Sequence, residues 1–589
     1  MALALEQGMR RRIWVYPLAL LLGITLTVFG VSLAFDVALH GDGLAGFRDL
    51  WSDLANRTTV SALDNAAEVV AAVLGIAITV VAIVVELAAN RYTHRITELF
   101  VAEPTNSIVM GFFVITALQC IAVSVVFPPD AALSVTGTVG SAVSMTMLAL
   151  SLLILLPYFS YVFSFLNPIS IVHRIRRHTL DVIASRSARM DVVKKQSEAV
   201  RGIEQLADVA LNAMEHKDKG VSMASVDALK TMVIDYQPIR KGLGARWFEV
   251  EGDLAVNPDF VSMAPSVLAG VTGRKIWLEM KVLRQYQTLY NEALNRMRDM
   301  NYLIAINTRR IAEAGLGAGN TELFYLAVKF FNTYLRATVN AKDVRTAYNV
   351  LNQYRLLAET CLQRREGEKA VELARYFKYY GGVSFHAKLP FILETVAYDL
   401  CALNEMADDL GDPEARHLLR IFLQVDRESE TEVQETSLRG VRKAQVKLAT
   451  FYLLRSKGHL AREVFKDMAG ERPERLASIR NELMAIESPE FWEISDRGVN
   501  FDYFSDERKQ KMVEFFEWFG NRIPPPPTRP SGEFHPSTIP ASSSAGTDRA
   551  REAEDWSGGP GTGGDPGRDT NPEDALEAEV GRVEPTSTV

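Results

Sequence analysis

Cysteine is scarce in this sequence of 589 residues, where only Cys120, Cys361 and Cys401 occur, far apart and without a CxxC pair. This argues against both a disulfide framework and a cysteine-ligated zinc site. The sequence also lacks an HExxH zinc motif, a Walker A phosphate loop and a G-x-S-x-G nucleophile turn. Since these common catalytic and metal-binding patterns are missing, we expect no enzyme, no metal and no cofactor.

Basic residues are not in excess, because 64 Lys and Arg stand against 72 Asp and Glu, for a formal net charge of −8. This balance gives no reason to expect binding to nucleic acid. Much of the acidity falls in residues 521–589, which hold twelve acidic residues, six arginines and no lysine. The same residues are rich in proline, glycine and serine, so we predict a disordered acidic tail that cannot bury a core.

Long apolar runs fill the first part of the chain. A helix needs about 20 apolar residues to cross a bilayer, and residues 13–35, 67–90, 107–127 and 139–165 satisfy this length. Basic residues next to membrane spans mark the cytoplasmic side. We therefore predict a multi-pass protein of the bacterial inner membrane, with residues 1–12 and the C-terminal part in the cytoplasm. The residues at the predicted cytoplasmic boundary are Arg91, His94, Arg95, Arg174, Arg176 and Arg177.

The second predicted span carries a line of small and polar residues at helical spacing, which places them on one face. We call this line the polar stripe; it comprises Glu68, Ala72, Gly75, Thr79, Ala82, Glu86 and Asn90. Small residues allow transmembrane helices to approach closely, so one interpretation is a packing surface. The other is a water-lined face, on which Glu68 and Glu86 of several copies form two acidic rings of a cation channel. We favour packing.

The amino-acid sequence around this span resembles a bacterial family of predicted integral membrane proteins that is classed only as a domain of unknown function. The resemblance covers roughly residues 10–230 and implies a membrane protein, but it names no activity. This chain departs from the family pattern at Arg91, where the family has glutamine, and at His94, where it has proline. The matching residues are Gly75, Thr79, Leu87, Ala88, Tyr92, Arg95, Phe100, Asn106, Gly111, Phe113, Thr116 and Cys120, followed by Gly202, Ile203, Gln205, Leu206, Asp208, Ala210 and Leu211.

The cytoplasmic part reads as helical throughout, with membrane-proximal helices over 169–319 and a helical-repeat domain over 320–520. Two helix pairs share a spacing of small residues around a turn glycine, which resembles the tetratricopeptide helical hairpin. Stacked hairpins of this kind form a groove that binds a peptide or another helix. The glycines between Gly315 and Asn320 are interpreted as a helix end and linker rather than a nucleotide loop. The paired positions are Leu357, Ala358, Cys361, Gly367, Ala370 and Ala374, and then Leu448, Ala449, Tyr452, Gly458, Ala461 and Phe465.

A loop dense in aromatic and charged residues precedes a closing helix predicted at about 505–519. We consider Trp492, Asp496, Arg497 and Asn500 as an interaction loop. The favoured alternative is a capping loop that is pinned by Trp492 and Phe501 and contains an internal Asp-Arg pair, because aromatic side chains usually pack.

Together these patterns predict an all-α protein with a four-helix transmembrane domain and a cytoplasmic helical-repeat domain that binds protein, as a scaffold or sensor. The alternative function is an oligomeric cation channel lined by the second span. The expected partners are membrane lipids, further copies of the chain, and a cytoplasmic protein or peptide.

Overall fold

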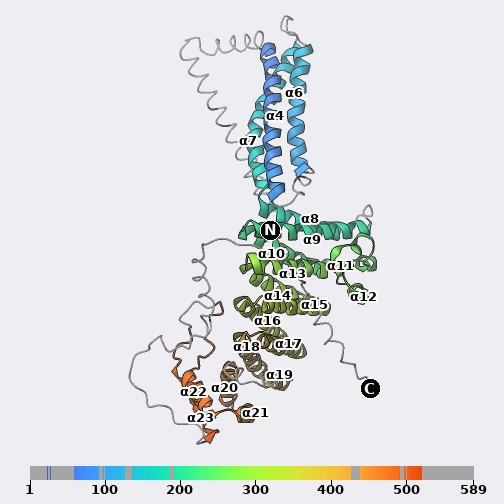
Figure 1. Cartoon of the computed structure of the whole chain (residues 1–589). Helices are drawn as coiled ribbons and strands as arrows, with labels where there is room; N and C mark the ends of the chain where they lie inside the picture. The colour runs from blue at the N-terminus through green and yellow to red at the C-terminus, as the bar shows by residue number, and fades with distance from the viewer. Residues whose placement is uncertain are drawn as a thin grey trace, which may run out of the picture. The chain divides into compact units, whose positions relative to one another are not determined.

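The computed structural model describes Gly23, Thr27 and residues 59–91, 97, 100–101, 103–126, 135–185, 191–425, 438–490, 496–498 and 500–520. These residues form helices joined by turns and short irregular connections, and no strand occurs among them. They all belong to one unit, residues 1–525 (Figure 1). The predicted disordered tail, residues 521–589, lies outside the described residues.

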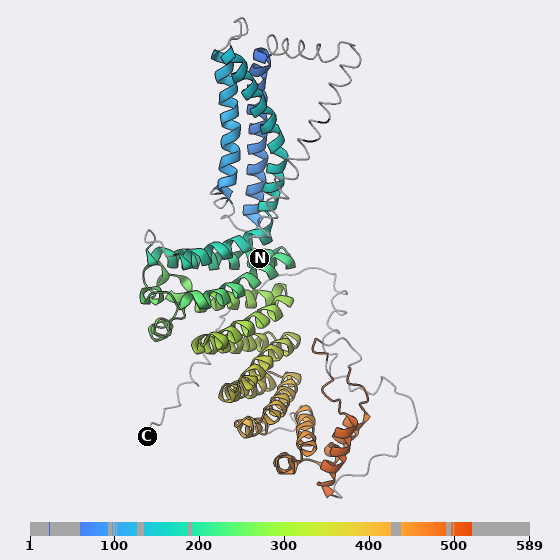
Figure 2. The same ribbon diagram turned by 180° about the vertical axis from the view of Figure 1, so that it is seen from behind.

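Among the described residues, three helices are long and apolar enough to cross a membrane: α4 (Thr59–Arg91), α6 (Pro104–Val126) and α7 (Val135–Phe165). Their apolar parts, Glu68–Asn90, Pro104–Val123 and Val143–Phe165, lie within or overlap the second, third and fourth predicted spans. They pack side by side, as both views show (Figure 1, Figure 2). The first predicted span, residues 13–35, lies outside the described residues apart from Gly23 and Thr27, so the count of four stays a prediction.

Two helices follow the membrane bundle, at the start of the region where the sequence predicts membrane-proximal helices. Asn167 caps α8 (Pro168–Ala184), and Asp191 caps α9 (Val192–Glu215). Arg174 of α8 lies 3.2 Å from the Glu103 carboxylate and 4.0 Å from the centre of the Phe165 ring. These contacts attach the start of α8 to the ends of α6 and α7.

The remaining helices stack in two layers that continue the α8–α9 pair. One layer contains α8, α10, α14, α16, α18 and α20, and the other contains α9, α13, α15, α17 and α19; Figure 2 shows the steps of this stack. Apolar residues on both sides of each helix are buried, which produces one continuous core. The further elements are α10 (Lys219–Arg240), η2 (Ala245–Phe248), η3 (Gly252–Leu254), α11 (Pro258–Val261), α12 (Pro265–Gly273), α13 (Trp277–Arg296), α14 (Asp299–Ala318), α15 (Thr321–Asn340), α16 (Val344–Gln363), α17 (Gly367–His386), α18 (Pro390–Asp409), α19 (Ala415–Phe422), α20 (Arg439–Leu454), α21 (Gly458–Met468), α22 (Pro473–Ala485) and α23 (Asp506–Glu517).

Several predicted helix limits can be compared with these bounds. The glycine cluster does end a helix, because Gly319 adopts φ 71° as the cap of α14 and Asn320 caps α15. The two paired spacings fall on α16–α17 and α20–α21, and the predicted limit at residue 320 falls between α14 and α15, which pack together. Identity with the tetratricopeptide hairpin stays a prediction.

Candidate functional site

The polar stripe lies on the side of α4 that faces away from α6 and α7. All seven of its residues are exposed, whereas Val70, Ala77, Val81 and Val85 of the same helix are buried. The Thr79 hydroxyl donates to the Gly75 carbonyl at 2.8 Å, so it is satisfied within the helix. The stripe is therefore not the surface through which α4 packs on its described neighbours. Both interpretations, packing by another helix and a water-lined path, stay predictions.

The predicted boundary arginines differ in their surroundings. Arg174 pairs with Glu103 as described above, and Arg176 Nη1 lies 2.6 Å from the Asp235 carboxylate of α10. Arg177 is exposed. The side chains of Arg91, His94 and Arg95 lie outside the described residues. Two of these arginines thus join helices within the protein.

The predicted interaction loop lies across the helices of one layer of the stack. Residues 496–504, which we call the groove segment, contact α16, α18 and α20 through their side chains. Within this segment Val499 lies outside the described residues, as does Trp492 just before it. The face of α16, α18 and α20 that receives the segment is called the groove below.

Arg497 makes the most buried contact of the groove segment. Its Nη1 donates to Asp399 Oδ1 at 2.6 Å, and its Nη2 donates to Asp399 Oδ2 at 3.3 Å and to the Tyr348 carbonyl at 2.6 Å. Only 4% of the Arg497 side chain and 2% of the Asp399 side chain are exposed. The guanidinium also lies 4.1 Å from the centre of the Tyr348 ring. A two-pronged, desolvated pair of this kind is among the stronger charged contacts in proteins.

Phe501 and Asp502 contact α18 and α20. The Phe501 ring stacks on Tyr398 with centroids 4.7 Å apart. Asp502 accepts a hydrogen bond from the Tyr398 hydroxyl at 2.5 Å and another from Lys443 at 2.6 Å. Lys447 donates to the Phe501 carbonyl at 2.6 Å. Arginine, aromatic ring and carboxylate thus each have a complementary place in the groove.

Asp496 and Arg497 do not pair with each other, so the predicted internal pair is wrong. Asp496 instead accepts from Asn349 at 2.9 Å and from Arg345 at 3.3 Å. The predicted pinning by Phe501 is confirmed by its ring stacking. Asn500 is buried and shapes the turn, since its side chain accepts from the Asp502 amide at 3.1 Å.

The electrostatics of the groove follow from these contacts. Hydrogen bonds from Asn349 and Arg345 lower the pKa of Asp496. Burial lowers the pKa of Lys447, which binds backbone carbonyls. Burial, with the nearby Asp502 carboxylate, raises the pKa of Glu394 to about 7. The charge of the Glu394 carboxyl therefore changes near neutral pH.

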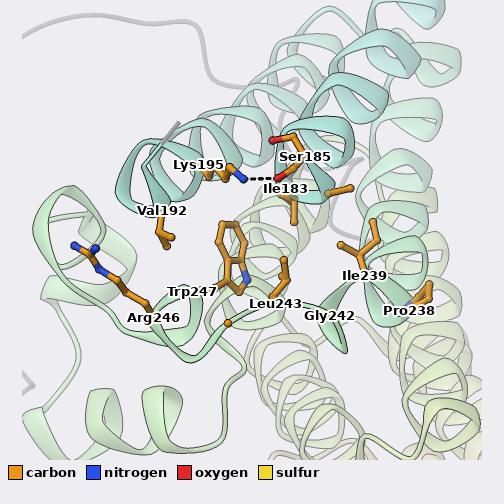
Figure 3. A pocket seen from close by; sticks show the side chains of 12 residues that line it. Ile183, Ser185, Val192, Lys195, Pro238, Ile239, Gly242, Leu243, Arg246 and Trp247 are labelled. Atoms are coloured by element: carbon orange, nitrogen blue, oxygen red, sulfur yellow. Dashed lines mark hydrogen bonds between the residues drawn. The ribbon is translucent and has the colours of Figure 1, made fainter. Parts of the chain in front are cut away.

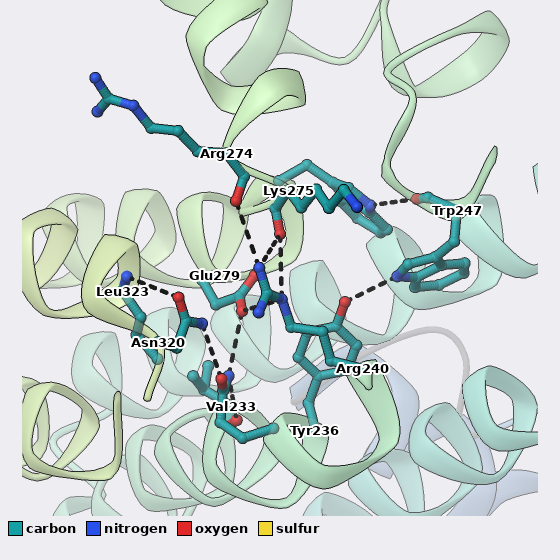
Figure 4. A network of polar contacts seen from close by, with 11 residues as sticks. Val233, Tyr236, Arg240, Trp247, Arg274, Lys275, Glu279, Asn320 and Leu323 are labelled. Atoms are coloured by element: carbon teal, nitrogen blue, oxygen red, sulfur yellow. Dashed lines mark hydrogen bonds and ion pairs between the residues drawn. The ribbon is translucent and has the colours of Figure 1, made fainter. Parts of the chain in front are cut away.

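A second polar cluster joins the upper helices of the stack (Figure 4). Glu279 is fully buried; its Oε1 accepts from Gln237 at 3.2 Å, while its Oε2 has no hydrogen-bond partner. Burial raises the pKa of Glu279. Asn320 donates to Gln237 at 2.9 Å, and Arg240 donates to the Lys275 carbonyl at 3.1 Å. These contacts cross-link α10, α13 and the start of α15, which is a structural role.

A cavity of about 430 Å³ lies beside this cluster, between α8, α9, α10 and η2 (Figure 3). Its walls include the apolar residues Ile183, Leu243 and Trp247. Lys195, at one side, donates to the Ser185 carbonyl. Within the described part of the chain, no group of three or more His, Cys, Asp or Glu side chains is arranged to hold a metal ion.

The sequence did not predict which residues of the helices contact the groove segment. Asp399, Tyr398, Lys443 and Lys447 lie in the middle of helices, where charged residues usually face solvent. One signal was present, because Lys443 and Lys447 are four residues apart and therefore share one helix face.

The comparisons with known proteins concern the membrane part. Residues 10–223 match a family model described as "Predicted membrane protein (DUF2254)". This part of the chain is similar to that family. The match extends from the first predicted span to the start of α10, so it includes the polar stripe but not the groove. No curated protein and no solved structure matches the chain significantly.

Proposed function

We propose that this protein is a membrane-anchored scaffold or sensor, whose cytoplasmic helical stack binds a segment of another protein. The observation that carries the proposal is the groove itself, since α16, α18 and α20 hold a non-helical segment through an ion pair, a ring stack and a carboxylate site. Stacked helical hairpins commonly use such a surface for peptide binding. The proposed location is the bacterial inner membrane, with both termini in the cytoplasm.

Photo-crosslinking from the full-length protein in cells tests this function. A photoreactive amino acid at Phe391, on α18, samples the groove side, because its ring lies 5.8 Å from that of Tyr348. The matched control is Tyr379 on α17, in the other layer; the two residues are 45% and 52% exposed. We expect crosslinks to a second polypeptide from position 391 and not from position 379. Equal labelling at both positions, or none at either, would contradict a partner bound at the groove.

The second candidate function is an oligomeric cation channel lined by the polar stripe. The direction of the stripe supports it, because all seven residues face away from α6 and α7 and are open to a path between copies. Ion flux through the purified protein in liposomes tests it. We expect cation flux to fall in Glu86→Gln and to persist in Glu86→Asp, which keeps the carboxylate. Absence of flux from folded, inserted protein would leave the scaffold function alone.

A further inference from the structure

The groove segment has the features of a bound ligand. Its side chains reach three successive helices of one layer, and Lys447 of α20 also donates to the Phe501 carbonyl. The Asn500 and Tyr503 amides of the segment donate to the nearby Pro489 and Asn500 carbonyls, each at 3.2 Å. The segment belongs to the connection between α22 and α23 rather than to a helix of the stack. It is therefore held by the same kinds of contact that a separate peptide would make.

Two charges of the groove, Asp399 and Lys443, keep a partner without the segment. Asp399 lies 3.3 Å from Arg355 Nε of α16, in addition to its contacts with Arg497. Lys443 lies 3.1 Å from Glu482 of α22, in addition to its contact with Asp502. A buried charge that loses its sole partner is strongly unfavourable. Because both groove charges have a second partner, departure of the segment leaves neither of them alone.

The segment, in turn, does not satisfy all of its own groups. Arg497 Nε is buried and has no hydrogen-bond partner. Glu394 lies beside Asp502, and the two carboxylates disfavour each other's charge. An unsatisfied buried donor and a like-charged neighbour both reduce the net stability of a contact. The bound state of the segment is thus open to competition.

We propose that residues 496–504 are a resident ligand that occupies the groove and that a partner segment bearing an arginine, an aromatic ring and a carboxylate displaces it. The partner takes the places of Arg497 at Asp399, Phe501 at Tyr398 and Asp502 at Lys443. The groove is then closed in the resting protein and opens by exchange. This inference rests on the proposed scaffold function and specifies its ligand chemistry and regulation.

A labelled peptide tests the exchange directly. The probe is a fluorescent synthetic peptide of residues 494–505, titrated by anisotropy into the full-length protein in detergent micelles. The proteins are the wild type, Arg497→Ala and Phe501→Ala, since the two variants weaken the resident segment at different places. Occupancy by the resident segment lowers the apparent affinity of a competitor by the open fraction, so we expect both variants to bind the probe at least about tenfold tighter than the wild type.

Two controls locate the binding. A probe with alanine in place of arginine should bind the variants at least about tenfold more weakly, and Asp399→Asn in the Arg497→Ala background should abolish binding of the normal probe. Circular dichroism and a thermal melt of each variant establish that it is folded. Equal affinity of wild type and folded variants for the probe, or no binding by any folded variant, would overturn the proposal.

The outcome separates this inference from the proposed function. If crosslinking from Phe391 captures a partner with equal yield in the wild type and Arg497→Ala, and the probe does not compete, the scaffold function stands and the resident ligand is refuted. If the probe binds as expected but no polypeptide crosslinks from Phe391, the resident ligand stands and the scaffold function is refuted.

Discussion

Gly202 of α9 lies directly against Thr179 of α8, and a methyl group on Gly202 would be 2.0 Å from the Thr179 hydroxyl oxygen. That hydroxyl donates to the Ile175 carbonyl at 2.8 Å, which fixes its position. Both residues are buried. The two helices immediately after the membrane therefore cross where only glycine fits. Gly202 also begins the second stretch that resembles the family, so close packing gives a physical reason for glycine there.

We expect Gly202→Ala to destabilise the protein by about 1–3 kcal/mol, because the added methyl group forces α8 and α9 apart. Adding Thr179→Ala should restore most of the loss, since it removes the two nearest atoms and leaves Thr179 Cβ at 3.1 Å. Chemical denaturation of the full chain in detergent, followed by circular dichroism, measures both. Gly270→Ala is the control, because no atom lies within 4 Å of its added methyl group. Equal stability of Gly202→Ala and wild type would refute the close crossing.

Glu394 should make stability depend on pH. Its pKa is raised from 4.5 to about 7, first by burial and then by the Asp502 carboxylate. A raised acid pKa means that the folded state binds more protons than the unfolded state between these values, so stability falls as pH rises through this window. We expect Glu394→Gln to stabilise the protein by about 2–3 kcal/mol at pH 8 and to have little effect near pH 4.5.

Unfolding of both proteins at a series of pH values measures this difference. Glu482→Gln is a useful comparison, because Glu482 is a half-exposed partner of Arg439 and Lys443. It should lose stability rather than gain it. A Glu394→Gln gain that is the same at pH 4.5 and pH 8 would show that ionisation of Glu394 is not its cause.

The membrane helices were predictable because spanning a bilayer depends on length and apolar composition, which the sequence displays directly. The end of α14 was predictable for a similar reason, since Gly319 and Asn320 act locally. The direction in which the polar stripe faces was not predictable. A helix in lipid is apolar on both its protein-facing and lipid-facing sides, so its periodicity identified a face without indicating what that face contacts.

The groove contacts could not be predicted from the sequence. Arg497 and Asp399 are 98 residues apart in the sequence. The residues next to each of them give no sign that its charged side chain is buried. Their burial depends on the stacking of α16 and α18, which brings Tyr348 and Arg355 to the same place. The aromatic density near Phe501 marked the loop as unusual, but the complementary residues Tyr398 and Lys443 carry no local signal.

Lys281 should hold the insertion between α10 and α13 in place. Its side chain is 2% exposed, and its ammonium lies 2.5 Å from Asp259 and 2.6 Å from Glu204. Removing one member of a buried ionic cluster leaves the others uncompensated, at a cost of about 3–5 kcal/mol. We expect Lys281→Met to increase amide hydrogen exchange in residues 252–263. Lys219→Met, at an exposed pair with Asp299, should change exchange little, because such pairs contribute less than about 1 kcal/mol. Unchanged exchange in both variants would contradict the role of Lys281.

Cysteine substitution should decide between the two interpretations of the polar stripe. The native cysteines that would interfere are all buried. If copies of α4 pack through the stripe, Ala82→Cys should form a disulfide-linked dimer under mild oxidation, because small residues let helix backbones approach within disulfide distance. Val81→Cys is the control, since Val81 is buried against the described helices and 4% exposed.

A water-lined path predicts a different pattern at the same position. Cysteines that face one another across water are too far apart to form a disulfide, but a charged, membrane-impermeant thiol reagent reaches them. Ala82→Cys should then be modified by the reagent without dimer formation, while Val81→Cys stays unmodified. If Ala82→Cys neither dimerises nor reacts, the stripe contacts lipid or another segment of the same chain, and neither homo-oligomeric packing nor a pore through this face is correct.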